Sequence, residues 1–398
     1  MAEGRSRPAW AEVDLAAIRH NVNLLRRVVA PAGLCAVVKA DAYGHGAPAV
    51  AKTAIEAGAA GLAVAMVEEG MELREAGITQ PILLLSEPPE DAATAVVAGG
   101  LTPTIATHGS VVRLTAAARS LGIRLAVHIK VDTGMHRAGM EPADVPDLVK
   151  AVLAEPTLRL EGLWTHLAVA DGTGPEDREF TATQLTRFDE VVAAAGTRPP
   201  VLHVANSAAA IAWPQARYNL VRCGIALYGE LPSPALADAL AEAAGGETLR
   251  PALSLKARVS SVRQLAAGER PSYGRLRPLP ERSVVATVPL GYADGVPRAL
   301  FDAGFSVLVG GRRRPLAGMV TMDQIVVDCG PDAAVEVGDE VTLLGSQGDE
   351  TVTTSEWASL LGTIGYEVLC GIGPRVPRVY SAESKATWGS WLSRGGMP

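Results

Sequence analysis

Short apolar runs and longer amphipathic stretches alternate along the first 230 residues of the chain. The apolar runs are rich in Val, Leu or Ile and lie at 34–39, 61–65, 81–85, 102–106, 124–131, 158–164, 201–205 and 219–223. Most are separated by Ala-rich amphipathic stretches, for example 47–57, 67–76, 108–121, 143–154 and 177–195. Strands that alternate with helices predict βαβ units and a parallel sheet, and continuous apolar strands fit a sheet covered on both faces. Eight such units favour a closed (β/α)8 barrel, with a doubly wound open sheet as the alternative.

The pattern changes near residue 245, where AEAAGGETLRPAL contains a Gly-Gly pair and a proline. Short β-rich runs separated by turn residues follow, and helical pattern is scarce except near 353–361; the runs lie at 253–263, 283–289, 305–309, 325–328 and 340–344. The predicted fold class is therefore α/β, with an N-terminal (β/α)8 TIM-type barrel followed by a mostly β C-terminal domain. The predicted limits are 1–11 for an N-terminal segment that joins the β domain, 12–245 for the barrel, 246–385 for the β domain and 386–398 for a tail.

Composition supports a large apolar core and argues against two classes of partner. Of the 398 residues, 48% are hydrophobic, and the formal net charge of −7 offers no basic field for nucleic acid or anionic lipid. The run Arg312-Arg313-Arg314 follows Gly310-Gly311, which predicts a solvated hairpin turn. The sequence MAEGRSRPAWAEVDL shows no apolar signal region, and no apolar run approaches the ~20 residues of a membrane span. We expect a soluble cytoplasmic protein.

Cysteine usage predicts neither disulfides nor a metal site. Cys35, Cys223, Cys329 and Cys370 are far apart, and three of them lie in apolar runs. They show no metal-ligand spacing. We expect reduced cysteines, mostly in the core, and no bound metal.

The stretch AVVKADAYGHG, residues 36–46, places Lys39 at the end of the first predicted strand. Lysine is rarely fully buried, and a lysine in partly apolar surroundings can act as a nucleophile or form a Schiff base. The alternative is a lysine that extends its charged end to water at a strand end. Within the same stretch, the pattern gives no assignment for His45.

Other predicted strand ends also carry polar side chains. Lys130 and Asp132 follow the fifth strand and His166 the sixth; His203, Asn206 and Ser207 follow the seventh, and Arg222 and Gly224 the eighth. In a barrel, the carboxyl ends of the strands meet on the one face where active sites form. These side chains therefore predict a shared site.

The motifs that carry these residues, taken in order, resemble one family. They are AVVKADAYGHG (36–46), KVDTGMHRAGM (130–140), WTHLA (164–168), HVANSAAA (203–210), VRCGIALYG (221–229), SYG (272–274), PLGYADG (289–295), TMDQ (321–324) and RVPRVY (375–380). With them the sequence resembles the alanine racemases from about Glu12 to about Tyr380. These are pyridoxal 5′-phosphate (PLP) enzymes built from a barrel and a β domain.

The resemblance implies a two-base racemase. By it, Lys39 carries PLP as a covalent Schiff base and serves as one base. Tyr273 is the second base on the opposite face of the substrate Cα, with His166 and Arg222 in hydrogen-bonded series behind it. Arg222 also faces the pyridine nitrogen of PLP. A guanidinium can only donate there, which favours reprotonation of Cα over transamination.

Further contacts are implied residue by residue. The phosphate is held by Tyr43, Ser207 and the backbone N–H groups of Gly224 and Ile225. Asn206 is also expected to bind the cofactor. Arg137 reaches the PLP phenolic oxygen and the substrate carboxylate, and Lys130 is the position that the family often carries as a carbamylated lysine bridging to that arginine. The substrate site is completed by the backbone of Met322, Asp323 beside the tyrosine base, and Tyr292.

In this family the β domain of one subunit caps the barrel mouth of the other. The resemblance therefore implies a homodimer with composite active sites, in which Tyr273, Tyr292 and Met322 act in trans. Three positions depart from the family pattern. Pro374 stands where a tyrosine is frequent, Met319 where an arginine is common, and His136 where a smaller residue is commoner. We expect weaker PLP retention or looser side-chain selection.

The implied function is interconversion of L- and D-alanine, which supplies D-alanine for peptidoglycan. A serine or broad-specificity amino-acid racemase is the alternative within the same chemistry. A PLP-dependent amino-acid decarboxylase of the same architecture is a different class, and Arg222 opposes it because such an enzyme needs an acidic partner for the pyridine nitrogen. A non-enzymatic PLP carrier is the remaining alternative, and such carriers typically lack a β domain.

Overall fold

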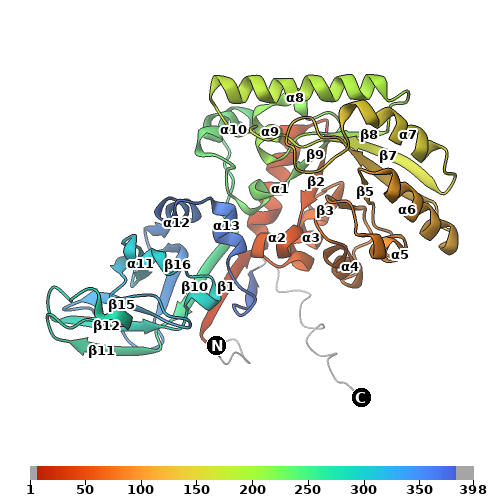
Figure 1. Ribbon diagram of the computed structural model, residues 1–398. Coiled ribbons are helices and arrows are strands. Elements are labelled where there is room, and N and C mark those ends of the chain that lie inside the picture. Colours follow the sequence, from red (N-terminus) through yellow and green to blue (C-terminus); the bar gives the residue numbers. More distant parts are fainter. Residues whose placement is uncertain (1–6, 382–398) are drawn as a thin grey trace, which may run out of the picture. The chain divides into compact units, whose positions relative to one another are not determined.

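The computed structural model describes residues 7–381, which form two compact units (Figure 1). One unit comprises residues 17–250, and the other combines residues 251–381 with the N-terminal residues 7–16. The predicted tail 386–398 and the beginning of the predicted segment 1–11 lie outside the described residues. The predicted domain limits stay predictions.

Parallel strands in the 17–250 unit close into a ring. They form two four-stranded sheets, β4-β3-β2-β9 and β5-β6-β7-β8. A parallel bridge from Leu83 to Thr102 joins the first sheet to the second, and the Arg222 N–H donates to the Ala205 carbonyl (2.9 Å) between the ends of β9 and β8. The strands are β2 (Gly33–Val37), β3 (Gly61–Val64), β4 (Ile82–Leu84), β5 (Thr104–Ile105), β6 (Leu125–Lys130), β7 (Leu158–Trp164), β8 (Val201–His203) and β9 (Leu220–Cys223). The predicted (β/α)8 barrel is confirmed over the open sheet.

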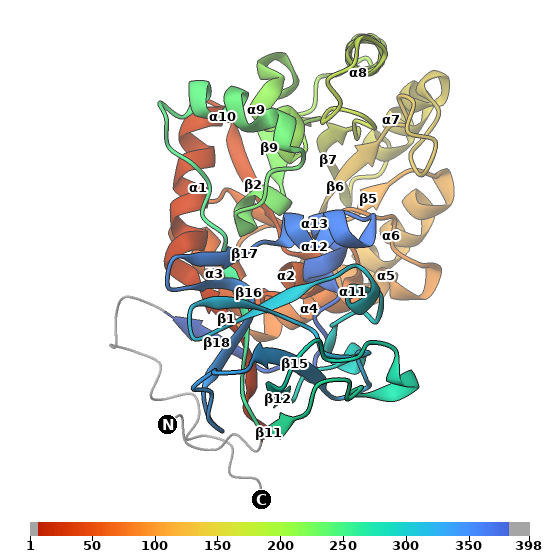
Figure 2. The same ribbon diagram turned by 90° about the vertical axis from the view of Figure 1, so that its left-hand side faces the viewer.

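Amphipathic helices surround these strands (Figure 2). In α6 (His108–Leu121), Val111, Leu114 and Ala118 are buried at helical spacing. The Thr107 side chain caps its first turn by accepting from the Ser110 N–H, and Gly122 ends it in the left-handed conformation. The other helices are α1 (Leu15–Val29), α3 (Ala47–Glu56), α4 (Val67–Glu75), α5 (Ala93–Ala98), α7 (Val145–Leu153), α8 (Pro175–Ala194), α9 (Ser207–Ala212) and α10 (Ala237–Ala243).

Polar side chains and one tryptophan fill part of the barrel interior. Strand register pairs Lys130 of β6 with Trp164 of β7, and Trp164 with His203 of β8. Two residues earlier, His128 pairs with Gly162, where an added Cβ would overlap the imidazole ring of His128. Alternate residues of a strand share a face, so the same face of β6 carries His128 and Lys130. The barrel core and the polar site described below are therefore continuous.

The second unit is built mainly from antiparallel strands. Its larger sheet has the order β14-β13-β16-β10-β1-β18, with β17 beside β16, and its smaller sheet the order β11-β12-β15. β1 pairs with β10 antiparallel and with β18 parallel, so the N-terminal strand lies within this sheet. The strands are β1 (Ala9–Asp14), β10 (Leu253–Arg258), β11 (Ser261–Leu265), β12 (Ser283–Val288), β13 (Ser306–Val309), β14 (Arg312–Pro315), β15 (Ile325–Gly330), β16 (Glu340–Gln347), β17 (Glu350–Val352) and β18 (Arg378–Ser381).

Three local predictions are corrected. The arginine run is not a turn: Arg312–Pro315 forms the edge strand β14, and the turn lies at Gly310-Gly311. Arg313 there pairs with Glu350 and Glu356, contacts that a local pattern does not reveal. The run 253–263 divides into β10 and β11, which belong to different sheets. Helices α11 (Ala299–Asp302) and α13 (Gly365–Cys370) accompany the expected α12 (Thr354–Leu361).

The cysteines behave as expected within the described residues. Cys35, Cys223 and Cys329 are buried, Cys370 is exposed, and no disulfide joins these four cysteines, all of which lie within residues 7–381. Over residues 7–381, no helix is both long enough and apolar enough to span a bilayer.

Asn21 of α1 provides a test of how the 17–250 unit is held together. Its buried amide donates to the Leu227 and Arg250 carbonyls (3.0 and 2.8 Å) and accepts from the Arg250 N–H (2.8 Å). Replacing it with alanine leaves buried backbone groups unpaired, so Asn21→Ala should lower stability by about 2 kcal/mol and the Tm by about 5 °C. Calorimetry at fixed protein and cofactor concentration measures this. Asn23→Ala is the control, because Asn23 lines a surface hollow; equal losses in both variants contradict the expectation.

Candidate active site

Lys39 opens a left-handed turn, α2 (Lys39–Gly44), just beyond β2. Strand β2 ends at Val37, so Lys39 lies past the strand end rather than within it as predicted. Residues 40–43 all have φ between 51 and 53°, a conformation that is unfavourable for L-amino acids. Specific hydrogen bonds hold this turn: the Ala40 N–H donates to Glu69 Oε1 (2.6 Å) and the Ala47 N–H to Asp41 Oδ1 (2.7 Å). Backbone strain of this kind is concentrated at functional sites.

The left-handed turn brings Tyr43 to a small backbone cradle. The Gly224 N–H donates to Ser207 Oγ (2.9 Å), and a Cβ on Gly224 would overlap the Tyr43 hydroxyl. Ile225 begins the 3-10 turn that follows Gly224. Asn206 caps α9 by accepting from the Ala209 N–H (3.0 Å). The structure thus brings together the residues predicted to hold a phosphate, although Asn206 already serves as a helix cap.

His45, which had no assignment from sequence, supports Tyr43. It is fully buried, its Nδ1 lies 3.0 Å from the Tyr43 carbonyl oxygen, and its ring packs on Tyr228 (4.5 Å between centroids). The Tyr43 ring packs on the same residue (4.8 Å), and Tyr228 Oη donates to the Val37 carbonyl (2.8 Å). His45 therefore fixes the turn that carries Tyr43.

Arg222 occupies the centre of the barrel site with its Nη hydrogens engaged. Nη1 donates to Nδ1 and to the carbonyl of His203 (2.8 and 2.9 Å). Nη2 donates to the carbonyls of Thr165 and Val204 (2.9 and 3.0 Å) and lies 3.3 Å from His166 Nδ1. The side chain is buried and stacks over Trp164 (4.5 Å). Its orientation is therefore fixed from several directions.

Two further histidines extend this network into the barrel. His203 accepts at Nδ1 from Arg222, so in its neutral form it carries its proton on Nε2 and donates to His128 Nδ1 (2.8 Å). Burial, followed by the charge of Arg222, lowers the pKa of His203 well below its usual range and that of His128 to about 3. Both rings are therefore neutral near pH 7, and their proton positions follow from the hydrogen bonds.

Positive charge accumulates around the site. Burial lowers the pKa of Lys130 to about 8, and the charges of Arg137, Arg222 and Lys39 add to this effect. Burial and the same cations hold the pKa of His166 well below its usual range. Lys130 Nζ also lies over Trp164, 4.5 Å from the ring centroid. Such a cluster attracts an anion and keeps His166 neutral.

Asp132 shapes the loop that leads to Arg137. Its Oδ1 accepts from the N–H groups of Gly134 and His136 (2.9 and 3.0 Å), and His136 adopts a left-handed conformation (φ 52°). Burial raises the pKa of Asp132, but the hydrogen bonds from His136 and Gly134 outweigh it, and the net shift is downward. The carboxylate therefore stays ionised and holds the loop.

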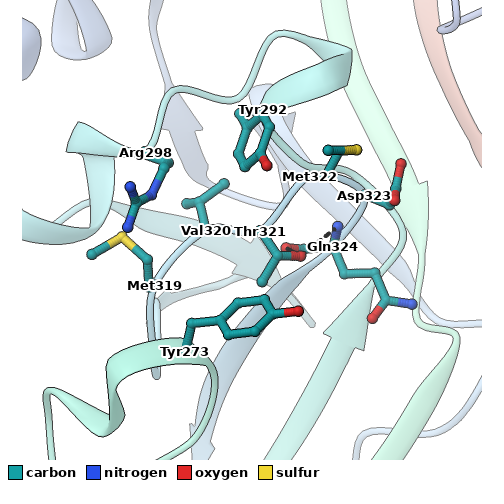
Figure 3. Close-up of a pocket in the computed structure, with 9 residues that line it drawn as sticks. All are labelled: Tyr273, Tyr292, Arg298, Met319, Val320, Thr321, Met322, Asp323 and Gln324. Carbon is teal, nitrogen blue, oxygen red and sulfur yellow. Dashed lines mark hydrogen bonds between the residues drawn. The ribbon is translucent and has the colours of Figure 1, made fainter.

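The remaining predicted site residues gather in the second unit. Tyr273, Tyr292, Met322 and Asp323 line a cavity of about 670 Å³, together with Arg298, Met319, Val320, Thr321 and Gln324 (Figure 3). Tyr273 is 75% exposed, and Tyr292 and Met322 are also exposed. The structure thus brings the predicted site residues together as two sets, one in each unit.

Comparison with known proteins assigns both units to one family. Residues 13–232 match the model of the alanine racemase N-terminal domain, and residues 252–380 match that of the C-terminal domain. This chain belongs to the alanine racemase family. An alanine racemase of Symbiobacterium thermophilum is 46% identical over 381 residues, which cover 95% of this chain and 98% of that protein.

Solved structures of the alanine racemase family share the fold. The alanine racemase of a D-cycloserine-producing Streptomyces lavendulae has a TM-score of 0.87 at 39% identity, covering 96% of this chain and 98% of that one. A histidine racemase of Leuconostoc mesenteroides has a TM-score of 0.85 at 29% identity, covering 95% and 99%. The architecture therefore serves more than one amino-acid racemase.

Several residues that support the site lie outside the alanine racemase motifs. Glu69 holds the turn after Lys39, His128 ends the hydrogen-bond chain from Arg222, and Arg7 pairs with Asp294 in the second unit. Only His128 carried a sequence signal, because it lies two residues before Lys130 on the same face of one strand. Glu69 also caps the start of α4 by accepting from the Ala65 and Met66 N–H groups, but its bond to Ala40 and the pairing of Arg7 with Asp294 join residues that are remote in sequence, and no local pattern marks them.

Gly224 tests the cradle directly. An added methyl group would displace the Tyr43 hydroxyl, so Gly224→Ala should weaken PLP binding by ~10-fold or more, as expected when a close backbone approach is blocked. Equilibrium titration of the apoenzyme with PLP, followed by absorbance, measures the change. Gly109→Ala, on the exposed face of α6, makes the same substitution and should bind PLP normally. Normal PLP binding by Gly224→Ala contradicts the assignment of the cradle.

Proposed function

We propose that this chain is an alanine racemase that interconverts L- and D-alanine with PLP held covalently on Lys39 and with two bases, Lys39 and Tyr273. It is an isomerase of the PLP-dependent alanine racemase family, whose reaction supplies D-alanine for peptidoglycan. One observation of the site carries the proposal. The Nη hydrogens of Arg222 are engaged by protein acceptors, which leaves its Nε–H as the donor for the pyridine nitrogen.

The residues fit PLP on structural grounds. A Cβ at Gly224 would overlap the Tyr43 hydroxyl of the cradle, and Arg137 and Arg222 provide the positive charge that an anionic cofactor needs. When bound, PLP withdraws electrons from the Cα of an attached amino acid and acidifies its proton. The chain's own residues then decide where that proton goes.

Racemisation needs a proton to leave one face of Cα and return on the other. In this proposal Lys39 Nζ exchanges the proton on one face, and Tyr273 Oη does so on the opposite face. An ordinary tyrosine has a pKa near 10, so its phenolate needs a donor nearby. His166 is suited to this role because Nδ1 faces Arg222, which places the proton of the neutral ring on Nε2.

Arg222 distinguishes racemisation from other PLP chemistry. A guanidinium keeps its protons, so its Nε–H can donate to the pyridine nitrogen without protonating it. A pyridine kept unprotonated by Arg222 would withdraw fewer electrons from Cα, so the bases of the chain would return the proton to Cα sooner. This argument opposes a decarboxylase of the same architecture, which would need an acidic partner at this nitrogen.

Two groups are assigned to the substrate carboxylate. Arg137 approaches from the barrel unit, and within the described residues no hydrogen bond engages its guanidinium. The second group is the Met322 N–H, because Met322 lines the cavity of the second unit together with Tyr292 and Asp323 (Figure 3). Both are donors suited to a carboxylate.

We further propose a homodimer with composite sites. The support is the exposure of Tyr273, Tyr292 and Met322 on the second unit, because large side chains that face solvent in one chain gain a partner surface in a dimer. The cytoplasmic location expected from the sequence stays a prediction.

The second candidate function is that of a racemase with broad amino-acid specificity. Two observations are reasons to compare alanine with larger amino acids as substrates: the cavity of about 670 Å³ and the fold shared with a histidine racemase. We expect alanine to give the highest kcat/KM among alanine, serine, lysine and histidine. A higher value for a larger substrate assigns the chain to broad-specificity racemases instead.

Lys130 is proposed to carry a carbamate that pairs with Arg137. Carbamate formation requires a neutral amine, and burial lowers the pKa of Lys130 to about 8, so the neutral fraction rises through the range pH 7–8. NMR of the enzyme in carbon-13 bicarbonate should show a carbamate signal that increases over this range. The signal should be absent in Lys130→Met but retained in Lys150→Met, whose amine is exposed. A spectrum of the unsubstituted enzyme without that signal contradicts the proposal.

Isotope exchange tests the two bases. In deuterated water, Tyr273→Phe should keep its PLP and lose racemisation by ~100-fold or more, while one enantiomer of alanine still exchanges its Cα proton through Lys39. Lys39→Ala should lose both exchange and the absorbance of the covalently bound cofactor. Tyr218→Phe, which removes a hydroxyl bonded to Asp189, is the control and should racemise normally. Full racemisation by Tyr273→Phe contradicts the two-base assignment.

A further inference from the structure

An ion pair between the partly exposed Arg7 and the buried Asp294 lies at the end of the turn that carries Tyr292. Arg7 Nη1 and Nη2 donate to Asp294 Oδ1 and Oδ2, both at 2.6 Å, and the Asp294 side chain has no exposed surface. The Gly291 N–H donates to the same carboxylate (2.9 Å), and Arg375 Nε lies 3.5 Å from it. Burying a carboxylate costs free energy unless such partners are present. The bidentate contact from Arg7 is the main compensation for burying Asp294.

Asp294 ends a short turn that carries Tyr292 into the cavity. This turn is attached to the loop 319–324 by two backbone bonds: the Tyr292 N–H donates to the Thr321 carbonyl (2.9 Å), and the Ala293 N–H to the Met322 carbonyl (3.0 Å). The contact requires a glycine at position 291, where a Cβ would overlap the Thr321 carbonyl. The position of Asp294 therefore determines the position of Met322.

The same loop is connected to Tyr273. Ser272 Oγ donates to the Met319 carbonyl (2.6 Å), and an added Cβ on Gly318 would overlap the Pro271 carbonyl. At its other end, Asp323 accepts from Arg375 Nη2 (2.6 Å). The loop 319–324 thus links the ion pair at one side of the cavity to the proposed base at the other.

A role in stability alone does not account for this arrangement. A buried salt bridge contributes little to stability compared with apolar packing, but removing Arg7 leaves Asp294 with only the Gly291 N–H and the longer contact to Arg375, so its poorly compensated charge is drawn towards water. Movement of Asp294 would shift the Tyr292 turn and, through the two backbone bonds, the Met322 N–H. A misplacement of about 1 Å at a catalytic site can reduce rates by ~100-fold.

We propose that Arg7 and Asp294 are positioning residues for the racemase reaction. Their ion pair holds the loop 319–324 so that the Met322 N–H meets the substrate carboxylate and Tyr273 Oη meets Cα. This inference rests on the proposed function, which assigns those two roles. It gives the N-terminal residue Arg7 an effect on catalysis although Arg7 itself touches no substrate.

Arg7→Ala in the full-length holoenzyme tests this role. The two readouts are the KM for alanine and the ratio of Cα-deuterium exchange to racemisation in deuterated water. Loss of the ion pair should raise KM by ~10-fold and should slow racemisation more than the exchange through Lys39, so the ratio should rise. PLP content should stay normal, because the residues proposed to hold PLP lie in the barrel unit. Variants that merely reduce the folded fraction lower exchange and racemisation equally.

Matched variants complete the experiment. Arg7→Lys keeps the charge but not the bidentate contact. Its KM and its exchange-to-racemisation ratio should therefore lie between those of Arg7→Ala and those of the unsubstituted enzyme. Arg313→Ala removes an exposed ion pair with Glu350 and Glu356 in the same unit and should change neither readout. If Arg7→Ala does not fold, an intermediate ratio in Arg7→Lys supports the inference and a wild-type ratio overturns it. An unchanged KM and ratio in Arg7→Ala also overturn it, whereas an unsubstituted enzyme that does not racemise alanine overturns the proposed function instead.

Discussion

The barrel site depends on how the buried guanidinium of Arg222 is satisfied. A buried cation needs hydrogen-bond acceptors, and two strand ends provide them to Arg222 of β9: Thr165 after β7, and His203 and Val204 at the end of β8. These acceptors take up the Nη hydrogens, so the direction of the remaining Nε–H is fixed before any cofactor binds. The donor proposed to face the pyridine nitrogen is thus preorganised by the fold.

The same cation sets the protonation states around it. It helps to keep His166, His203 and His128 neutral, and with Arg137 it lowers the pKa of Lys130. Within a barrel interior this excess of positive charge is unfavourable until an anion arrives. The free energy of cofactor binding therefore includes relief of repulsion among the chain's own cations, which couples PLP binding to stability.

Sequence predicted the features that follow from local periodicity and from the rules of parallel sheets. The alternation of apolar runs and amphipathic stretches located the barrel strands, and polar residues at strand ends located Lys39, Lys130, His166 and Arg222. The left-handed turn at 40–43 was hidden, because Ala and Tyr ordinarily avoid that conformation and a tertiary bond to Glu69 helps to impose it. The Arg7–Asp294 pair joins residues 287 positions apart, and no local pattern could reveal it.

The two proposed bases are held in contrasting ways. Lys39 opens a turn fixed by several hydrogen bonds, and the residues around it are mostly buried. Tyr273 is 75% exposed in a single chain, and the bond from Ser272 to Met319 fixes its backbone rather than its hydroxyl. A base held by its backbone needs that backbone to be placed accurately. The Arg7–Asp294 ion pair anchors the loop 319–324 and so places the backbone of Tyr273. The barrel core places the backbone of Lys39.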